Sequence, residues 1–132
     1  GYVRSELLGA GAVEQFHKLP EVTRRKTAQA GRLIAALAPY RRVVQLPKVP
    51  AGCRPNWHVF AVLVDPSKRD WVIRALKAEG LGAAFHYVPL HSAPYARQSA
   101  DIDHVELPVT DRAAASLVRL PTSAASAAPA RS

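Results

Sequence analysis

The apolar run from Val59 to Val64 constrains the fold more than any other part of the sequence. The run is rich in β-branched residues and is followed at once by Asp65-Pro66, a strong turn signal. A continuous apolar run of this length is typical of a strand that is covered on both faces. We therefore predict a central strand here, around which the rest of the chain builds its core.

A helix and a second strand are predicted directly after this run. Ser67 is suited to cap the helix, and Asp70, three residues later, makes a variant of the capping box. The helix should stop at Gly80, because a glycine followed by Leu81 supplies the left-handed residue and the hydrophobic contact of a helix C-terminus. Ala83 to Val88 then has the composition of a second strand. The sequence leaves open whether the two strands run parallel or antiparallel.

Two longer helices are predicted before this strand-helix-strand unit. The first begins at Ser5-Glu6 and ends at Leu19-Pro20, and the second spans about Glu21 to Ala38, before Pro39. Arg42 to Leu46 is a candidate short strand, and a proline-rich loop separates it from the central strand. The apolar stripe of the second helix, which should face the core, consists of Val22, Ala30, Leu33, Ile34 and Leu37.

The last predicted helix runs from Thr110 through Arg119, with Asp111 in its first turn. After Pro121 the chain contains mainly Ala, Ser and Pro and no large apolar residue, so we expect disorder or a loose helix there. The fold class is therefore α/β, with an α+β small domain. We divide the chain into linking helices at 1–38, a small α/β domain at 39–120 and a disordered tail at 121–132.

Composition narrows the class of protein. The formal net charge of +8 permits an anionic partner, such as nucleic acid, a membrane surface or a phosphate-bearing small molecule. The basic residues are scattered, without zinc-finger spacing or an RNP-like aromatic motif, so a solvated surface is favoured over nucleic-acid binding. The single cysteine, Cys53, cannot form an internal disulfide, and neither a signal-peptide pattern nor a membrane-spanning apolar run is present. We expect a cytoplasmic protein.

The segment from Ser92 to Leu107 lacks periodicity and concentrates acidic residues around one histidine. Carboxylates in an irregular loop, without a second anchored histidine, are more often solvated than bound to a metal ion. We therefore expect no metal site in this cluster, which consists of Asp101, Asp103, His104 and Glu106.

Three blocks of the sequence resemble a known family. The run from Gly80 to Pro94, followed by Leu107 to Thr110 and by Val118 to Pro121, closely resembles the C-terminal part of pyridoxal-phosphate-dependent nucleotide-sugar aminotransferases. The likeness is strongest to dTDP-4-amino-4,6-dideoxygalactose transaminases. The N-terminal Tyr2 to Leu8 resembles the family segment that follows the cofactor-bearing region. The resemblance implies the C-terminal domain of a fold type I aminotransferase. The tail departs from the family, and so does the N-terminal motif, which lacks the family's common asparagine and has Val3 in its vicinity.

The resemblance implies pyridoxal 5'-phosphate in the full-length enzyme and a nucleotide-linked 4-keto-6-deoxy sugar as substrate. It places the cofactor lysine upstream of Gly1, so we expect the chain to be a fragment that is inactive alone, with no catalytic residue and no covalently bound cofactor. It implies substrate-binding roles for His86, Tyr87 and His91. It further implies that Tyr2, Arg4 and Ser5 lie near the cofactor phosphate or substrate of a neighbouring subunit.

Other interpretations remain open from the residues alone. His86 could be a hydrogen-bonded strand histidine, and Tyr87 a core aromatic with a solvated hydroxyl. Trp57 and Trp71 are both expected to pack. A different function is a non-catalytic basic binding or interaction module that reuses the small domain. In the family interpretation the partners are the missing large domain or a neighbouring subunit, in a homo-oligomer.

Overall fold

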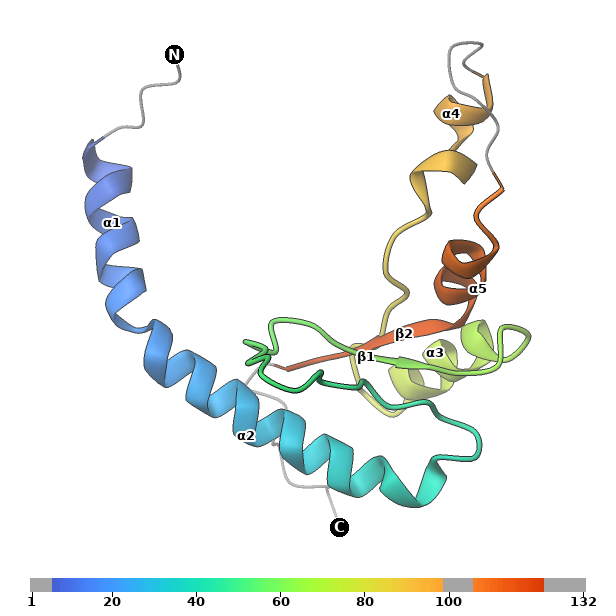
Figure 1. Cartoon of the computed structure of the whole chain (residues 1–132), viewed down its shortest axis with the longest axis horizontal. Helices are drawn as coiled ribbons and strands as arrows, with labels where there is room; N and C mark the ends of the chain where they lie inside the picture. Colours follow the sequence, from blue (N-terminus) through green and yellow to red (C-terminus); the bar gives the residue numbers. More distant parts are fainter. Residues whose placement is uncertain (1–5, 99–105, 123–132) are drawn as a thin grey trace.

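A computed structural model describes residues 6–98 and 106–122 as a small sheet flanked by helices (Figure 1). The helices and strands, in chain order, are α1 (Glu6–His17), α2 (Leu19–Leu37), β1 (Phe60–Leu63), α3 (Arg69–Ala78), α4 (Pro94–Gln98), α5 (Pro108–Ser116) and β2 (Leu117–Leu120). Two single turns of 3-10 helix, Ala38–Tyr40 and Leu90–Ser92, complete the described elements.

The sheet is formed by β1 and β2, which run antiparallel with Phe60 opposite Leu120 and Leu63 opposite Leu117. Isolated bridges extend the pairing on both sides, from Gln45 to Leu63 and from Ala84 to Arg119. The predicted central strand is therefore confirmed, because β1 has a backbone partner along both of its edges. Arg42 to Leu46 contributes only the bridge at Gln45.

Two predictions about the strands were wrong. Ala83 to Val88 is not a strand, since only Ala84 pairs with the sheet and the chain then leaves it. Leu117–Leu120 forms β2, although Leu117 to Arg119 was assigned to the end of a helix. The apolar residues of this short run fit both periodicities equally well, and the need to pair the free edge of β1 decides in favour of the strand.

The core lies between the sheet, α2 and α3. Phe60 and Val118 are fully buried, and the ring of Trp57 lies 5.7 Å from that of Phe60, centroid to centroid. Ala30 of α2 and Ile73 of α3 are buried in the same cluster. Three further residues of the predicted stripe on α2 pack against it: Leu33, Ile34 and Leu37.

Two predicted apolar contacts are absent from this core. Val22, the first residue of the predicted stripe on α2, is 43% exposed because it lies near the end of the helix that extends beyond the sheet (Figure 1). Trp71, which was expected to pack like Trp57, is 64% exposed on the outer side of α3. Helical spacing near the start of α2 therefore overestimates the burial of Val22.

The C-terminus of α3 follows the sequence prediction. Gly80 has φ of +80°, and its N–H donates to the carbonyl oxygen of Lys77 at 3.0 Å. The N–H of Leu81 donates to the carbonyl oxygen of Leu76 at 2.8 Å. These two bonds form a Schellman motif, which satisfies carbonyl groups that the helix itself leaves unpaired.

The start of α3 differs from the prediction, since the helix begins at Arg69 and Ser67 does not cap it. The hydroxyl of Ser67 donates instead to Oδ1 of Asp65 at 2.6 Å, and the Ser67 N–H donates to the same oxygen at 2.8 Å. These hydrogen bonds hold the pKa of Asp65 below its ordinary value. Asp65 thus captures the hydroxyl that would have capped the helix.

The helices α1 and α2 confirm the two predicted N-terminal helices, with a break at Lys18. α5 ends at Ser116, earlier than predicted, because Leu117 already has extended dihedral angles. The short helix α4 was not predicted. Residues 123–132 lie outside the described residues, so the disorder of the tail stays a prediction.

Candidate functional site

The segment from Phe85 to Pro89 carries the most distinctive residues of the predicted site, and it leaves the sheet after Ala84 to run toward α4 (Figure 1). The side chains of His86 and Tyr87 are exposed, Tyr87 by 73%. Their rings lie 4.5 Å apart, centroid to centroid, at an interplanar angle of 57°. Neither residue is buried, so neither has the core role left open by the sequence.

His91 is separated from this exposed pair. Its side chain is only 20% exposed, and its Nε2 lies 2.8 Å from Oδ1 of Asp111 in the first turn of α5. In the same turn of 3-10 helix the hydroxyl of Ser92 donates to the carbonyl oxygen of Pro89 at 3.0 Å. His91 therefore connects the segment to α5, which positions the exposed residues before it.

A concave surface of about 440 Å³ lies between this segment, α3 and α5. Tyr87 lines it from one side and Asp111 from another. Arg69, from the start of α3, also lines it and donates from Nη1 to the carbonyl oxygen of Ala114 at 2.8 Å. This bond connects α3 to α5. The concavity thus combines the guanidinium group of Arg69, the carboxylate of Asp111 and the ring of Tyr87.

Sequence reasoning missed two residues of this surface, Arg69 and Arg97. Arg69 appeared only as a residue near a helix start, and Arg97 as one of many scattered basic residues. No local sequence pattern identifies either arginine as a site residue, because the other residues of this surface come from distant parts of the chain. The pairing of His91 with Asp111 was missed for the same reason.

The remaining predicted site residues, Tyr2, Arg4 and Ser5, lie outside the described residues, and their roles stay predictions. Asp101, Asp103 and His104 lie outside them too, so the expected absence of a metal site is also still a prediction. Within residues 6–98 and 106–122, no helix is both long and apolar enough to cross a membrane.

A pyridoxal phosphate site needs a lysine for the Schiff base and an acid facing the ring nitrogen. None of the chain's lysines lines the concavity beside Tyr87. Lys26 lines a groove on α2, and among the described residues of that groove none is acidic or aromatic. The described residues therefore do not form a complete cofactor site by themselves. The other lysines, Lys18, Lys48, Lys68 and Lys77, are exposed.

The model of the DegT/DnrJ/EryC1/StrS aminotransferase family matches residues 4–128. The chain belongs to this family. Its membership confirms the resemblance seen in the sequence, although the likeness to one particular transaminase stays a prediction.

The fold of this chain is also similar to that of solved structures. The aminotransferase TlmJ from Streptoalloteichus hindustanus is 30% identical with a TM-score of 0.73, and the match covers 83% of this chain and 28% of TlmJ. S. venezuelae DesV is 28% identical with a TM-score of 0.71, over 80% of this chain and 28% of DesV. A DegT/DnrJ/EryC1/StrS aminotransferase from Brucella abortus is 26% identical with a TM-score of 0.68, over 83% and 28%. The chain thus spans less than a third of the length of the structures that it matches, and the mixed fold of helices around a small sheet is confirmed.

Proposed function

We propose that this chain forms the C-terminal part of a pyridoxal-phosphate-dependent aminotransferase that acts on a nucleotide-linked 4-keto-6-deoxy sugar. In that enzyme it supplies one wall of the substrate cleft and a surface for the cofactor-bearing large domain or a neighbouring subunit. The exposed His86–Tyr87 pair, held away from the sheet within a chain of this family, is the observation that carries the proposal.

The residues around the concavity suit such a substrate. The ring of Tyr87 offers a flat wall and a hydroxyl, and His86 beside it offers ring nitrogens for hydrogen bonds to a sugar. The guanidinium groups of Arg69 and Arg97 line the same surface and suit an anionic diphosphate. His91 acts as a positioning residue through its contact with Asp111.

The reactive part of the site belongs to the large domain in this proposal. When bound, pyridoxal phosphate supplies the electron sink of transamination. The residues of this chain bind the sugar, orient it and exclude water. Because the described residues do not complete a cofactor site, we propose that the chain alone is inactive.

Apolar side chains near the concavity support a role as a contact surface. Leu90 is 87% exposed and Tyr95 is 79% exposed, both beside the segment that carries the pair. We assign these two exposed side chains, Leu90 and Tyr95, to a contact with the large domain or a neighbouring subunit.

A chimera tests this function. The matched part of TlmJ from Streptoalloteichus hindustanus is replaced by this chain, and amino-sugar formation from a panel of nucleotide-linked 4-keto-6-deoxy sugars is followed by mass spectrometry. We expect turnover, and we expect the variant H86A/Y87A to raise KM by about ten-fold, as for the loss of roughly 1.4 kcal/mol of binding. Trp71→Ala, an exposed aromatic on the outer side of α3, is the matched control.

Two results would contradict the proposal. One is a folded chimera that binds pyridoxal phosphate but aminates none of the sugars. The other is a KM that the pair of substitutions leaves unchanged. Separately, the chain alone mixed with pyridoxal phosphate should develop no cofactor absorbance beyond that of the free compound.

A further inference from the structure

The two arginines that line the concavity beside Tyr87 differ in how their charges are balanced. Arg69 is held on two sides, since its Nε and Nη2 lie 2.9 Å and 2.8 Å from Oδ1 of Asp70. Its Nη1 donates to the carbonyl oxygen of Ala114 at 2.8 Å. The neighbouring carboxylate therefore balances the charge of this guanidinium group. Arg69 connects α3 to α5 and adds little net charge to the concavity.

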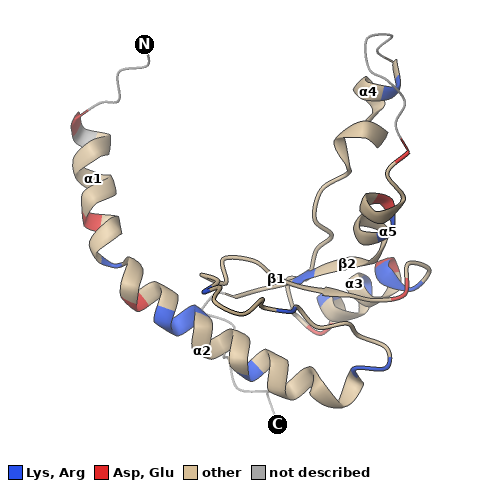
Figure 2. Cartoon of the chain, viewed as in Figure 1, with Lys and Arg blue, Asp and Glu red and all other residues tan. Residues whose placement is uncertain are grey.

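Arg97 has no such partner. It lies in the last turn of α4, its side chain is exposed, and it lines the same concavity. Within residues 6–98 and 106–122, no carboxylate forms an ion pair with it. Figure 2 shows a basic position on α4 and charges of both signs on α5. The guanidinium group of Arg97 is therefore the cation best suited to the diphosphate of a nucleotide-linked sugar.

Asp111 supplies a carboxylate to the same concavity, and His91 balances its charge only when the imidazole is protonated. Nε2 of His91 lies 2.8 Å from Oδ1 of Asp111, so an N–H at Nε2 donates to the carboxylate. His91 is only 20% exposed and is not one of the residues that line the concavity. The pair has no net charge with an imidazolium and one net negative charge with a neutral imidazole. Histidine changes between these forms in the range of about pH 5 to 8.

Most other ionisable groups near the pair keep their charge in this range. Arg69 and Arg97 face the concavity as cations, and Tyr87 faces it as a phenol. Arg112 of α5 lines a different surface. A second histidine, His86, has its ring against that of Tyr87, but it is not one of the residues that line the concavity. Within this range the charge that faces the concavity therefore changes through His91.

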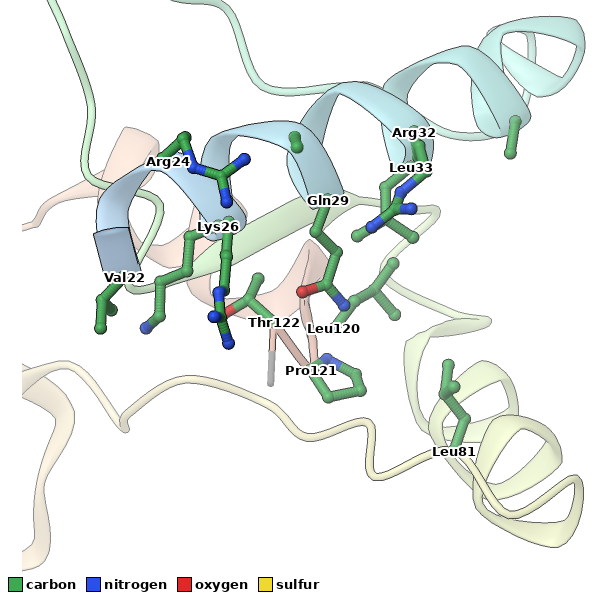
Figure 3. A pocket seen from close by; sticks show the side chains of 13 residues that line it. Val22, Arg24, Lys26, Gln29, Arg32, Leu33, Leu81, Leu120, Pro121 and Thr122 are labelled. Carbon is green, nitrogen blue, oxygen red and sulfur yellow. The ribbon is translucent and has the colours of Figure 1, made fainter. Parts of the chain in front are cut away.

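A groove along α2 offers a comparison, because it is more basic but lacks this pair (Figure 3). Its volume is about 750 Å³, and its cations are Arg24, Arg25, Lys26 and Arg32. Arg24 and Arg25 contact Glu21 at 2.7 Å and 2.6 Å, and these hydrogen bonds lower the pKa of Glu21 to about 2. None of the described residues that line the groove is a histidine. The charge of this groove is therefore constant across the range in which His91 titrates.

We propose that Arg97 binds the diphosphate of the nucleotide-linked substrate and that the proton on His91 controls this binding through Asp111. With His91 protonated, the net charge that faces the diphosphate is positive. With His91 neutral, the unbalanced carboxylate of Asp111 repels the same anion. The substrate therefore binds more tightly when His91 carries its proton. The inference rests on the proposed function, because it concerns the substrate of the same concavity.

Binding of thymidine diphosphate glucose to this chain, followed by NMR chemical shifts at about pH 6 and pH 8, provides the test. Each phosphate of this compound has a single acidic oxygen, which is ionised at both pH values, and the sugar has no keto group to react. We expect Kd to rise at least about three-fold from the lower to the higher pH, as for one unit charge near an anion in a solvated site.

The role of Arg97 is tested against a matched arginine of the α2 groove. Arg97→Gln should weaken binding at the lower pH by about five-fold or more, because it removes a charge-assisted contact. Arg32→Gln makes the same change in net charge and should leave Kd unchanged within about two-fold.

Two substitutions in the pair separate a charge effect from a loss of structure. His91→Gln keeps an N–H for Asp111 but carries no charge, so binding should be weak and equal at both pH values. Asp111→Asn keeps an acceptor oxygen but removes the repulsion. At the higher pH it should therefore bind as tightly as the unmodified chain does at the lower pH. If the pair only holds the segment in place, both variants weaken binding, and that result would overturn the proposal.

Three further results would overturn it: no binding to the unmodified chain, a Kd that does not change with pH, or equal losses in Arg97→Gln and Arg32→Gln. Turnover by the chimera with TlmJ tests the proposed function separately. Turnover together with pH-independent binding contradicts only this inference, whereas pH-dependent binding without turnover contradicts only the proposed function.

Discussion

Apolar side chains are buried in the sheet but exposed on α1. Phe60 of β1 is fully buried, whereas Phe16 of α1 is 71% exposed, although both are phenylalanines in regular elements of one short chain. The difference arises because β1 has partners on both edges and helices beside it, while α1 extends beyond the body of the molecule (Figure 1). The stability of the chain is therefore concentrated in the sheet, and α1 is available for contacts with another molecule.

The largest expected effect comes from replacing these two phenylalanines by alanine. Phe60→Ala removes a fully buried ring and should lower the free energy of unfolding by roughly 3–5 kcal/mol. Phe16→Ala should change it by less than about 0.5 kcal/mol in the monomer. Urea denaturation at a concentration where the chain is monomeric measures both. Equal losses would mean that α1 is as well packed as the sheet.

Replacing one glycine in each region by alanine should have a smaller effect on stability, with opposite signs in the two regions. Gly80 has φ of +80° at the end of α3, so Gly80→Ala forces a left-handed alanine and should cost about 1–2 kcal/mol. Gly9 lies inside α1 with open space around its Cα, so Gly9→Ala should stabilise the helix by about 0.5–1 kcal/mol. Urea denaturation tests the first and helical circular dichroism the second. Two losses would contradict this contrast.

The contact between His91 and Asp111 should matter less, because Asp111 is half exposed. Asp111→Ala should cost no more than about 1 kcal/mol of global stability. It should nevertheless speed hydrogen exchange at Leu90–Ser92, since this turn loses its contact with α5. Glu106→Ala, an exposed carboxylate just before α5, is the control. Unchanged exchange at the turn would show that His91 does not hold the segment.

The smallest expected effect is on how the unfolding free energy depends on pH. Because the folded pKa of Asp65 is lowered, the stability that its ionised form contributes is complete above the ordinary pKa of aspartate and is lost as the pH falls through the lowered value. The difference in unfolding free energy between the wild type and Asp65→Asn should therefore be constant near neutral pH and shrink in acid. A difference that grows on acidification would contradict the assigned hydrogen bonds.

Much of the fold could be predicted because its signals are local. The apolar run at Val59–Val64, the glycine at position 80 and the proline limits of α2 each act within a few residues, and the structure confirms the elements that they predicted. The family blocks likewise placed His86 and Tyr87 among the candidate site residues. Their exposure is what the structure adds.

Contacts between distant residues could not be predicted in this way. Leu117–Leu120 forms a strand because it pairs with β1, which lies more than fifty residues earlier in the chain. The assembly of Arg69, Tyr87 and Asp111 around one concavity depends on three separate elements.

The sequence by itself thus determined the central strand, the helices with clear ends and membership of the aminotransferase family, because each rests on neighbouring residues or on a run of them. Only the tertiary structure decided which segment completes the sheet, which cations share a surface with Tyr87 and which apolar residues stay exposed. The physical reason is that burial and backbone pairing are settled between elements far apart in the chain, where local periodicity carries no information.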